Sequence, residues 1–130
     1  MKVLLDTNFI IAVIADRIDL LNELRKFGKP EVFIPELVEE ELKKLAESRG
    51  RDGANARLAL QYIKSSGFGT LKTRKDHTDR EIERAARTLG MHVCTIDRKL
   101  AETLIRKGMP VITIRQRKYL AIEKKHGTTS

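Results

Sequence analysis

Short apolar runs alternate with amphipathic segments along this chain, and glycines separate several of them. The first run, residues 3–5, suits a strand that is covered on both faces of a parallel sheet. Further runs predict strands at residues 32–34, 92–96 and 111–114, with a very short one at 70–71. Strands that alternate with helices indicate an α/β fold with right-handed crossovers. We therefore expect a mostly parallel sheet of about five strands.

Helical patterns fill the spaces between these strands. Apolar residues at helical spacing predict a helix over residues 9–15 and a second helix that ends at Phe27, with Asp16 as its cap. Pro35 suits the first turn of a third helix, which extends to about Ser48. The remaining predicted helices cover residues 54–64, 78–89 and 97–107. The long helical region between the second and third strands is where we expect a protruding helical hairpin.

Four acidic residues occupy positions that would bring them to one edge of this sheet. Asp6 and Asp97 directly follow apolar strands, and Asp79 lies in the first turn of a helix. Glu41 falls on the apolar side of its helix, about 9 Å along the axis from the helix start. Ligands of α/β proteins bind at the carboxyl ends of the strands, so the four carboxylates can converge on one crevice.

Each of these acids also has a structural explanation. Asp6 and Asp97 suit helix N-caps, and an acid in a first turn, such as Asp79, interacts favourably with the helix dipole. Asp76 competes with Asp79 for the same role, and Glu41 can lie at the rim of the apolar stripe and reach water or a lysine. The functional interpretation therefore depends on the four acids being close together in the fold.

Clustered carboxylates predict a divalent metal ion. They raise one another's pKa values and destabilise the fold unless a cation compensates them. A cluster without His or Cys disfavours zinc and suits Mg²⁺ or Mn²⁺, which prefer oxygen ligands. Such an ion can activate a water molecule and stabilise charge on a scissile phosphate.

The basic charge is concentrated near the end of the chain. Of the formal net charge of +8, residues 1–97 contribute +1, from 17 Lys and Arg against 16 Asp and Glu. Residues 98–130 contribute +7, from 9 against 2. This asymmetry is typical of polyanion-binding proteins, although a solvated lysine-rich surface would look the same. Combined with an acidic crevice, it favours a protein that cuts nucleic acid.

Four short motifs together resemble those of the PIN-domain ribonucleases. They are LLDTN at the start, EEELKKL with its inward Glu41, Asp79 followed by Ile82 and the pair Ala85 and Ala86, and TIDRKL after an apolar strand. The resemblance extends from Val3 to about Tyr119. It implies an α/β fold of three layers, α/β/α, with the PIN-like nuclease domain at residues 1–116 and a basic C-terminal extension at residues 117–130.

The resemblance also implies the chemistry. The family cleaves RNA endonucleolytically with Mg²⁺ or Mn²⁺, which assigns catalysis and metal binding to Asp6, Glu41, Asp79 and Asp97. Neighbouring polar residues would support these acids: Thr7, Asn8 and Thr95. Many relatives carry a second acid two residues after the fourth, where this chain has Lys99. The fourth metal contact is therefore left to Asp97 alone.

Within the family, the segments DTNFI, TIDRKL and VITIRQRKYLAIE look most like the PIN nucleases of pre-ribosomal RNA processing and their archaeal relatives. The toxin nucleases of VapBC modules share the four acids and are the nearest alternative. The expected partners are RNA and either a ribosome-assembly protein or an antitoxin, and a homodimer is a further expectation because the family often dimerises. The candidate RNA contacts are Arg98, Lys99, Arg115, Arg117 and Lys118.

The last residues allow two structures, and the whole chain suggests one compartment. The basic tail is expected to be a disordered end or an extra helix that packs Tyr119, Leu120 and Ile122 against the domain. The single cysteine, Cys94, cannot form an internal disulfide, and no leader or long apolar span is visible. We therefore expect a cytoplasmic protein without a membrane segment.

Other function classes fit the first strand less well. A receiver domain would carry paired acids there, but LLDTN has only Asp6. A dinucleotide-binding domain would show a glycine-rich turn, and a haloacid-dehalogenase-type phosphatase would need an acid where Asn8 stands. A non-catalytic RNA-binding module is the alternative from a different class, because basic residues alone can supply affinity for RNA.

Overall fold

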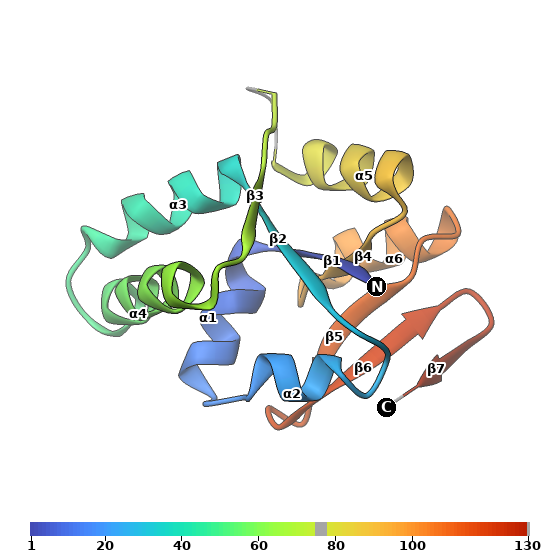
Figure 1. Cartoon of the computed structure of the whole chain (residues 1–130), viewed down its shortest axis with the longest axis horizontal. Helices are drawn as coiled ribbons and strands as arrows, with labels where there is room; N and C mark the ends of the chain where they lie inside the picture. The colour runs from blue at the N-terminus through green and yellow to red at the C-terminus, as the bar shows by residue number, and fades with distance from the viewer. Residues whose placement is uncertain (75–77, 130) are drawn as a thin grey trace.

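The computed structural model describes residues 1–74 and 78–129, in which one sheet has the strand order β3-β2-β1-β4-β5-β6-β7 (Figure 1). The strands are β1 (Lys2–Leu5), β2 (Glu31–Pro35), β3 (Gly69–Leu71), β4 (His92–Cys94), β5 (Val111–Arg115), β6 (Tyr119–Lys124) and β7 (Gly127–Thr129). The helices are α1 (Thr7–Ala15), α2 (Leu20–Leu24), α3 (Glu36–Ala46), α4 (Arg51–Ser66), α5 (Thr78–Leu89) and α6 (Arg98–Arg106). Asp76, the competitor of Asp79, lies outside the described residues.

Five of these strands form the parallel part of the sheet, as the apolar runs predict. β1 is central and pairs in parallel with β2 on one side and β4 on the other. β3 and β5 extend the parallel sheet outward. Val3, Leu4 and Leu5 are completely buried, which explains why the first strand carries no alternating polar residue. Asp6 therefore follows three completely buried residues.

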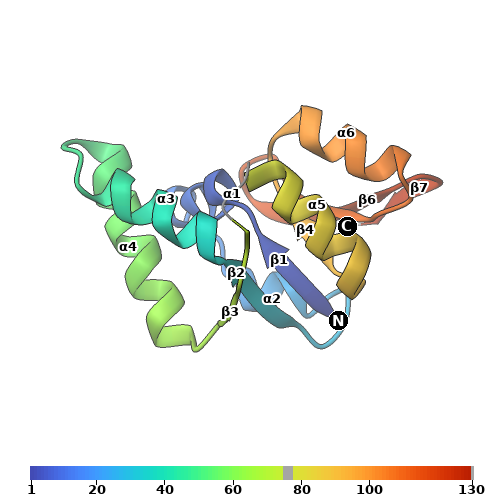
Figure 2. The ribbon, with the colours of Figure 1, turned by 90° about the horizontal axis from the view of Figure 1, so that it is seen from above.

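The helices cover the sheet as right-handed crossovers require. The chain moves from β1 outward through β2 to β3, and then crosses to β4 and β5 on the other side of β1, so the later helices lie on the opposite face. α3 and α4 pack against each other and form the expected helical hairpin, whereas α5 lies beside α6 (Figure 2). The three-layer α/β/α arrangement is confirmed.

The last residues differ from the prediction, because they form strands. β6 pairs antiparallel with β5, with Ile114 opposite Leu120, and β7 continues the sheet. Both the expected disordered end and the expected extra helix are wrong for residues 119–129. The hairpin was missed because its turn contains no glycine: Gln116 and Arg117 both take a φ of +53°, a conformation that favours Gly. Leu120 is completely buried, so the strand contributes to the core.

The start of the second helix also differs from the prediction. Asp16 is the C-cap of α1, and α2 begins only at Leu20. The N-cap is Asp19, whose carboxylate accepts a hydrogen bond from the backbone N–H of Asn22 at 3.3 Å. Asp16 and Asp19 are both good cap residues, so their side chains alone do not decide between them.

Candidate functional site

Asp6 lies at the junction of β1 and α1 and is only 8% exposed. Its Oδ1 accepts a hydrogen bond from the backbone N–H of Thr7, and its Oδ2 accepts one from the Thr95 hydroxyl, both at 2.8 Å. The carboxylate is thus the N-cap of α1 and is also fixed to the end of β4. Its role as a cap does not exclude a functional role, because a carboxylate that accepts these hydrogen bonds can also contact a cation.

The buried position makes Asp6 harder to ionise than an ordinary aspartate. Burial is the main cause that raises its pKa, and the negative charges of Asp79 and Glu41 raise it further. The hydrogen bonds from Thr95 and Thr7 act in the opposite direction. The structure therefore brings Asp6, Glu41 and Asp79 within electrostatic reach of one another.

Glu41 is half buried and is held by two threonine hydroxyls. Its Oε2 accepts a hydrogen bond from Thr7 Oγ1 at 2.8 Å, and its Oε1 accepts one from Thr78 Oγ1. Glu41 therefore connects α3 to the first residues of α1 and α5. A position at the rim of the apolar stripe predicted water or a lysine as the partner of Glu41. The structure instead gives Glu41 two threonine hydroxyl groups as hydrogen-bond donors.

The prediction did not identify Thr78 as a site residue. Thr78 and Glu81 form a capping-box pattern in the sequence, which assigns Thr78 to the start of a helix. In the structure its hydroxyl donates to Glu41, and Glu81 accepts hydrogen bonds from the backbone of Arg74 and from Arg84. The signal available in the sequence was a hydroxyl residue at the start of the helix that carries Asp79.

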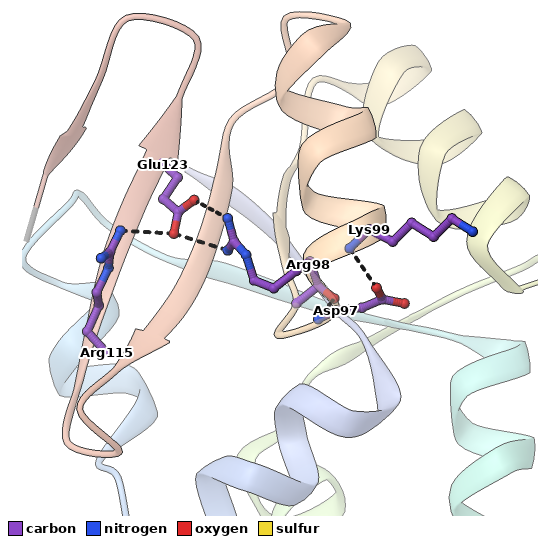
Figure 3. A network of polar contacts seen from close by, with 6 residues as sticks. Asp97, Arg98, Lys99, Arg115 and Glu123 are labelled. Carbon is purple, nitrogen blue, oxygen red and sulfur yellow. Dashed lines mark hydrogen bonds and ion pairs between the residues drawn. The ribbon is translucent and has the colours of Figure 1, made fainter.

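Asp97 and Asp79 line a pocket of about 300 Å³ between α5 and α6. Asp97 caps α6, because its Oδ1 accepts hydrogen bonds from the backbone N–H groups of Lys99 at 3.0 Å and Leu100 at 3.2 Å. Figure 3 shows Asp97 at this helix start, with the Lys99 side chain extending toward α5. A larger pocket of about 500 Å³ lies at the N-terminal end of β2 and contains none of the predicted site residues.

Thr95 connects Asp97 to Asp6. It is completely buried, donates its hydroxyl hydrogen to Asp6 and accepts a hydrogen bond from the backbone N–H of Asp97 at 3.1 Å. The four predicted acids are thus linked in three ways. The charges of Asp79 and Glu41 act on Asp6, Asp79 and Asp97 line one pocket, and Thr95 bridges Asp6 and Asp97. Asn8, the other predicted support, is exposed on α1.

The carboxylate oxygens of these residues suit a hard cation, although the described part of the chain does not bring three of the carboxylates together. Among residues 1–74 and 78–129, no three His, Cys, Asp or Glu side chains lie close enough together to hold a metal ion. Mg²⁺ commonly binds through one or two carboxylates and keeps several waters, so three converging acids are not required. The residues present therefore fit Mg²⁺ or Mn²⁺ with water as the remaining ligands.

Three of the predicted RNA contacts form ion pairs. Arg98 and Arg115 both contact Glu123, at 2.9 Å and 3.0 Å, as Figure 3 shows. Arg117 contacts Asp16 at 2.9 Å. Lys99 lines the same pocket as Asp79 and Asp97. These basic groups occupy the edge of the sheet at which Asp6 and Asp97 lie, because β5 runs parallel to β1 and β4.

Known proteins share both the sequence pattern and the fold. The family model described as "PIN like domain" matches residues 3–117. Ribonuclease VapC9 of Archaeoglobus fulgidus is 31% identical over 119 residues, which cover 91% of this chain and 86% of that protein. Ribonuclease VapC4 of Methanocaldococcus jannaschii is 32% identical over 127 residues, which cover 93% and 95%. The solved structure of the PIN domain endonuclease Utp24 superimposes with a TM-score of 0.79 at 26% identity, covering 95% of this chain and 91% of that one.

The raised pKa of Asp6 predicts how stability changes with pH. Because the folded protein holds a proton on Asp6 more readily than the unfolded chain does, ionising Asp6 costs stability as pH rises. In EDTA, the wild type should therefore gain stability relative to Asp6→Asn as the pH falls from about 7 toward 4. Urea unfolding of both proteins across this range measures the difference.

The control is Asp52→Asn, which makes the same atomic change in the exposed first turn of α4. Its difference from the wild type should lack the trend expected for Asp6→Asn. If acidification leaves the difference in unfolding free energy between the wild type and Asp6→Asn unchanged, or shifts it in favour of Asp6→Asn, then the pKa of Asp6 is not raised by folding.

Proposed function

Because the chain belongs to the family of PIN-like domains, we propose that it is a metal-dependent endoribonuclease with Asp6, Glu41, Asp79 and Asp97 as its catalytic, metal-binding acids. The observation that carries the proposal is the buried carboxylate of Asp6, whose pKa is raised mainly by burial and further by the charges of Asp79 and Glu41. A bound divalent cation would relieve this unfavourable charge.

When bound, Mg²⁺ or Mn²⁺ would supply an activated water molecule and stabilise the charge that develops on the scissile phosphate. Asp6, Glu41, Asp79 and Asp97 would hold the ion, directly or through water. Thr7, Thr78 and Thr95 orient the carboxylates, since each donates a hydroxyl hydrogen bond to Glu41 or Asp6. The burial of Asp6 lowers the local dielectric and so strengthens its attraction for a cation.

RNA is the proposed substrate for two reasons. The relatives at 31% and 32% identity are named as ribonucleases, and the family model covers residues 3–117. Lys99 also lines the pocket that Asp79 and Asp97 share, and Arg98 and Arg115 line a second pocket, so these basic residues are the proposed contacts to the substrate phosphates.

For the biological role we propose RNA processing, in particular of ribosomal RNA. This role rests on the resemblance of the sequence motifs to PIN nucleases of pre-ribosomal RNA processing and on the likeness to the endonuclease Utp24 over 95% of the chain. A ribosome-assembly protein would then be a partner, and a homodimer is a further assembly that we propose from the family.

A toxin nuclease of a VapBC module is the second candidate role, favoured by the two VapC relatives, and its partner would be an antitoxin. Growth arrest on expression, relieved by a small protein encoded beside the gene, would favour the toxin. For either role we propose a cytoplasmic location, which agrees with the free, buried Cys94. No helix in the described part of the chain has the length and apolar character needed to span a membrane.

Cleavage of a structured RNA tests the proposed activity. The wild type should cut with Mn²⁺ or Mg²⁺ and not with EDTA, whereas Asp6→Asn and Asp97→Asn should lose detectable cleavage. Both aspartates are N-caps, and asparagine caps helices equally well, so both variants should fold. Asp52→Asn should cut like the wild type. A wild type that binds RNA but cuts none with any divalent ion would be a non-catalytic binding module instead.

The hydroxyl of Thr95 provides a second test of the same site. Thr95→Val keeps the shape of the side chain but removes the hydrogen bond to Asp6, so Mn²⁺ affinity should fall by about 10–100-fold. Thr95→Ser keeps the hydroxyl and should retain most of the affinity. Melting curves over a Mn²⁺ titration measure both, since an ion that binds only the folded protein stabilises it by about 2.7 kcal/mol at 100 times its Kd. Equal Mn²⁺ affinity in both variants would show that the Thr95 hydroxyl does not support the metal site.

A further inference from the structure

A second pocket lies at the turn between β4 and α6 and contains no proposed metal ligand. It has a volume of about 400 Å³ and is lined by Ile96, Arg98, Thr113, Ile114, Arg115 and Glu123. Ile96 directly precedes Asp97, which lines the pocket shared with Asp79. Arg98 lines the second pocket and Lys99 lines the pocket of Asp79 and Asp97, so the turn between β4 and α6 contributes alternate residues to the two pockets.

The pocket has two arginines that share one glutamate. Arg98 donates from Nη1 to Glu123 Oε1 at 3.2 Å and from Nη2 to Oε2 at 2.9 Å, and Arg115 donates from Nη2 to Oε1 at 3.0 Å. The Glu123 side chain is 12% exposed, whereas those of Arg98 and Arg115 are 54% and 42% exposed. Figure 3 shows Glu123 between the two guanidinium groups.

This arrangement leaves positive charge and hydrogen-bond donors facing solvent. Two arginines and one glutamate carry a net charge of +1. A guanidinium group has five N–H donors, and the contacts with Glu123 use two from Arg98 and one from Arg115. The planar fork of arginine matches the oxygens of a phosphate group, and contact with Glu123 limits the rotation of both side chains before a ligand arrives.

The other lining residues complete a site for a nucleotide. Ile96 is 37% exposed and offers apolar surface beside the two arginines. Thr113, on β5, is buried and is also one of the lining residues. A nucleotide has both an anionic phosphate and an apolar base face, so it matches a pocket that combines these surfaces.

We propose that this pocket binds the RNA nucleotide adjacent to the scissile phosphate, with Arg98 and Arg115 contacting its phosphate and Ile96 packing against its base or ribose. The proposal rests on the proposed endoribonuclease function and assigns its substrate a path across the turn between β4 and α6. An ion-pair cluster that serves only the fold is the alternative, but exposed ion pairs contribute little to stability.

The test is the binding of a fluorescent single-stranded RNA in EDTA, where no cleavage interferes. Arg98→Ala and Arg115→Ala should each weaken binding by about tenfold and reduce the dependence of affinity on salt by roughly one phosphate contact. Arg106→Ala is the matched control, since it removes the same charge from the exposed, opposite end of α6. Melting curves must show that all three variants fold.

A neutral methylphosphonate at single positions of the RNA locates the contact. A methylphosphonate next to the cleavage point should weaken RNA binding by the wild type. It should not weaken binding by Arg98→Ala any further, because both changes remove the same interaction between Arg98 and the phosphate. Additive losses at every position, or Arg98→Ala and Arg115→Ala binding like Arg106→Ala, would overturn the subsite.

The outcomes for the subsite and for the proposed activity are separable. If the wild type cuts RNA with Mn²⁺ while the arginine variants bind normally, the subsite is wrong and the activity stands. If no RNA is cut but scanning the methylphosphonate finds one position that is non-additive with Arg98→Ala, the pocket binds RNA and the activity is wrong.

Discussion

The burial of the Asp6 carboxylate is the constraint on which the rest of the site depends. β1 is the middle one of the five parallel strands, so the residue that follows it is surrounded by protein, and Asp6 is only 8% exposed. A carboxylate in this position needs hydrogen-bond donors, and it finds them in the backbone of Thr7 and the hydroxyl of Thr95. These contacts fix the start of α1 and the end of β4 relative to each other.

Threonine hydroxyls extend the same arrangement to the neighbouring elements. Thr7 and Thr78 donate to Glu41, which joins α3 to the starts of α1 and α5, and Thr95 accepts from the backbone of Asp97 at the start of α6. The acids therefore have structural roles as caps and as hydrogen-bond acceptors. A structural explanation for each acid does not compete with a functional one, because a carboxylate that accepts these hydrogen bonds can still contact a cation.

The sequence predicted the parts of this structure that depend on local patterns. The apolar runs located the five parallel strands, and Asp6 and Asp97 followed from the ends of two of them. The hairpin of β5 and β6 was not predicted because Gln116 and Arg117 occupy a turn conformation that favours glycine. The pairing of β6 with β5, and not the local sequence, holds this turn in place. The contact between Thr78 and Glu41 spans 37 residues, so no local pattern could reveal it.

The central claim is that a divalent cation binds at Asp6 with the help of the neighbouring acids. The most direct measurement is the anomalous scattering of Mn²⁺ in crystals of the wild-type protein soaked in the ion. The account predicts a peak beside the Asp6 carboxylate that is also close to at least one of Glu41, Asp79 and Asp97. A well-ordered crevice without such a peak, or Mn²⁺ bound only elsewhere on the protein, would contradict it.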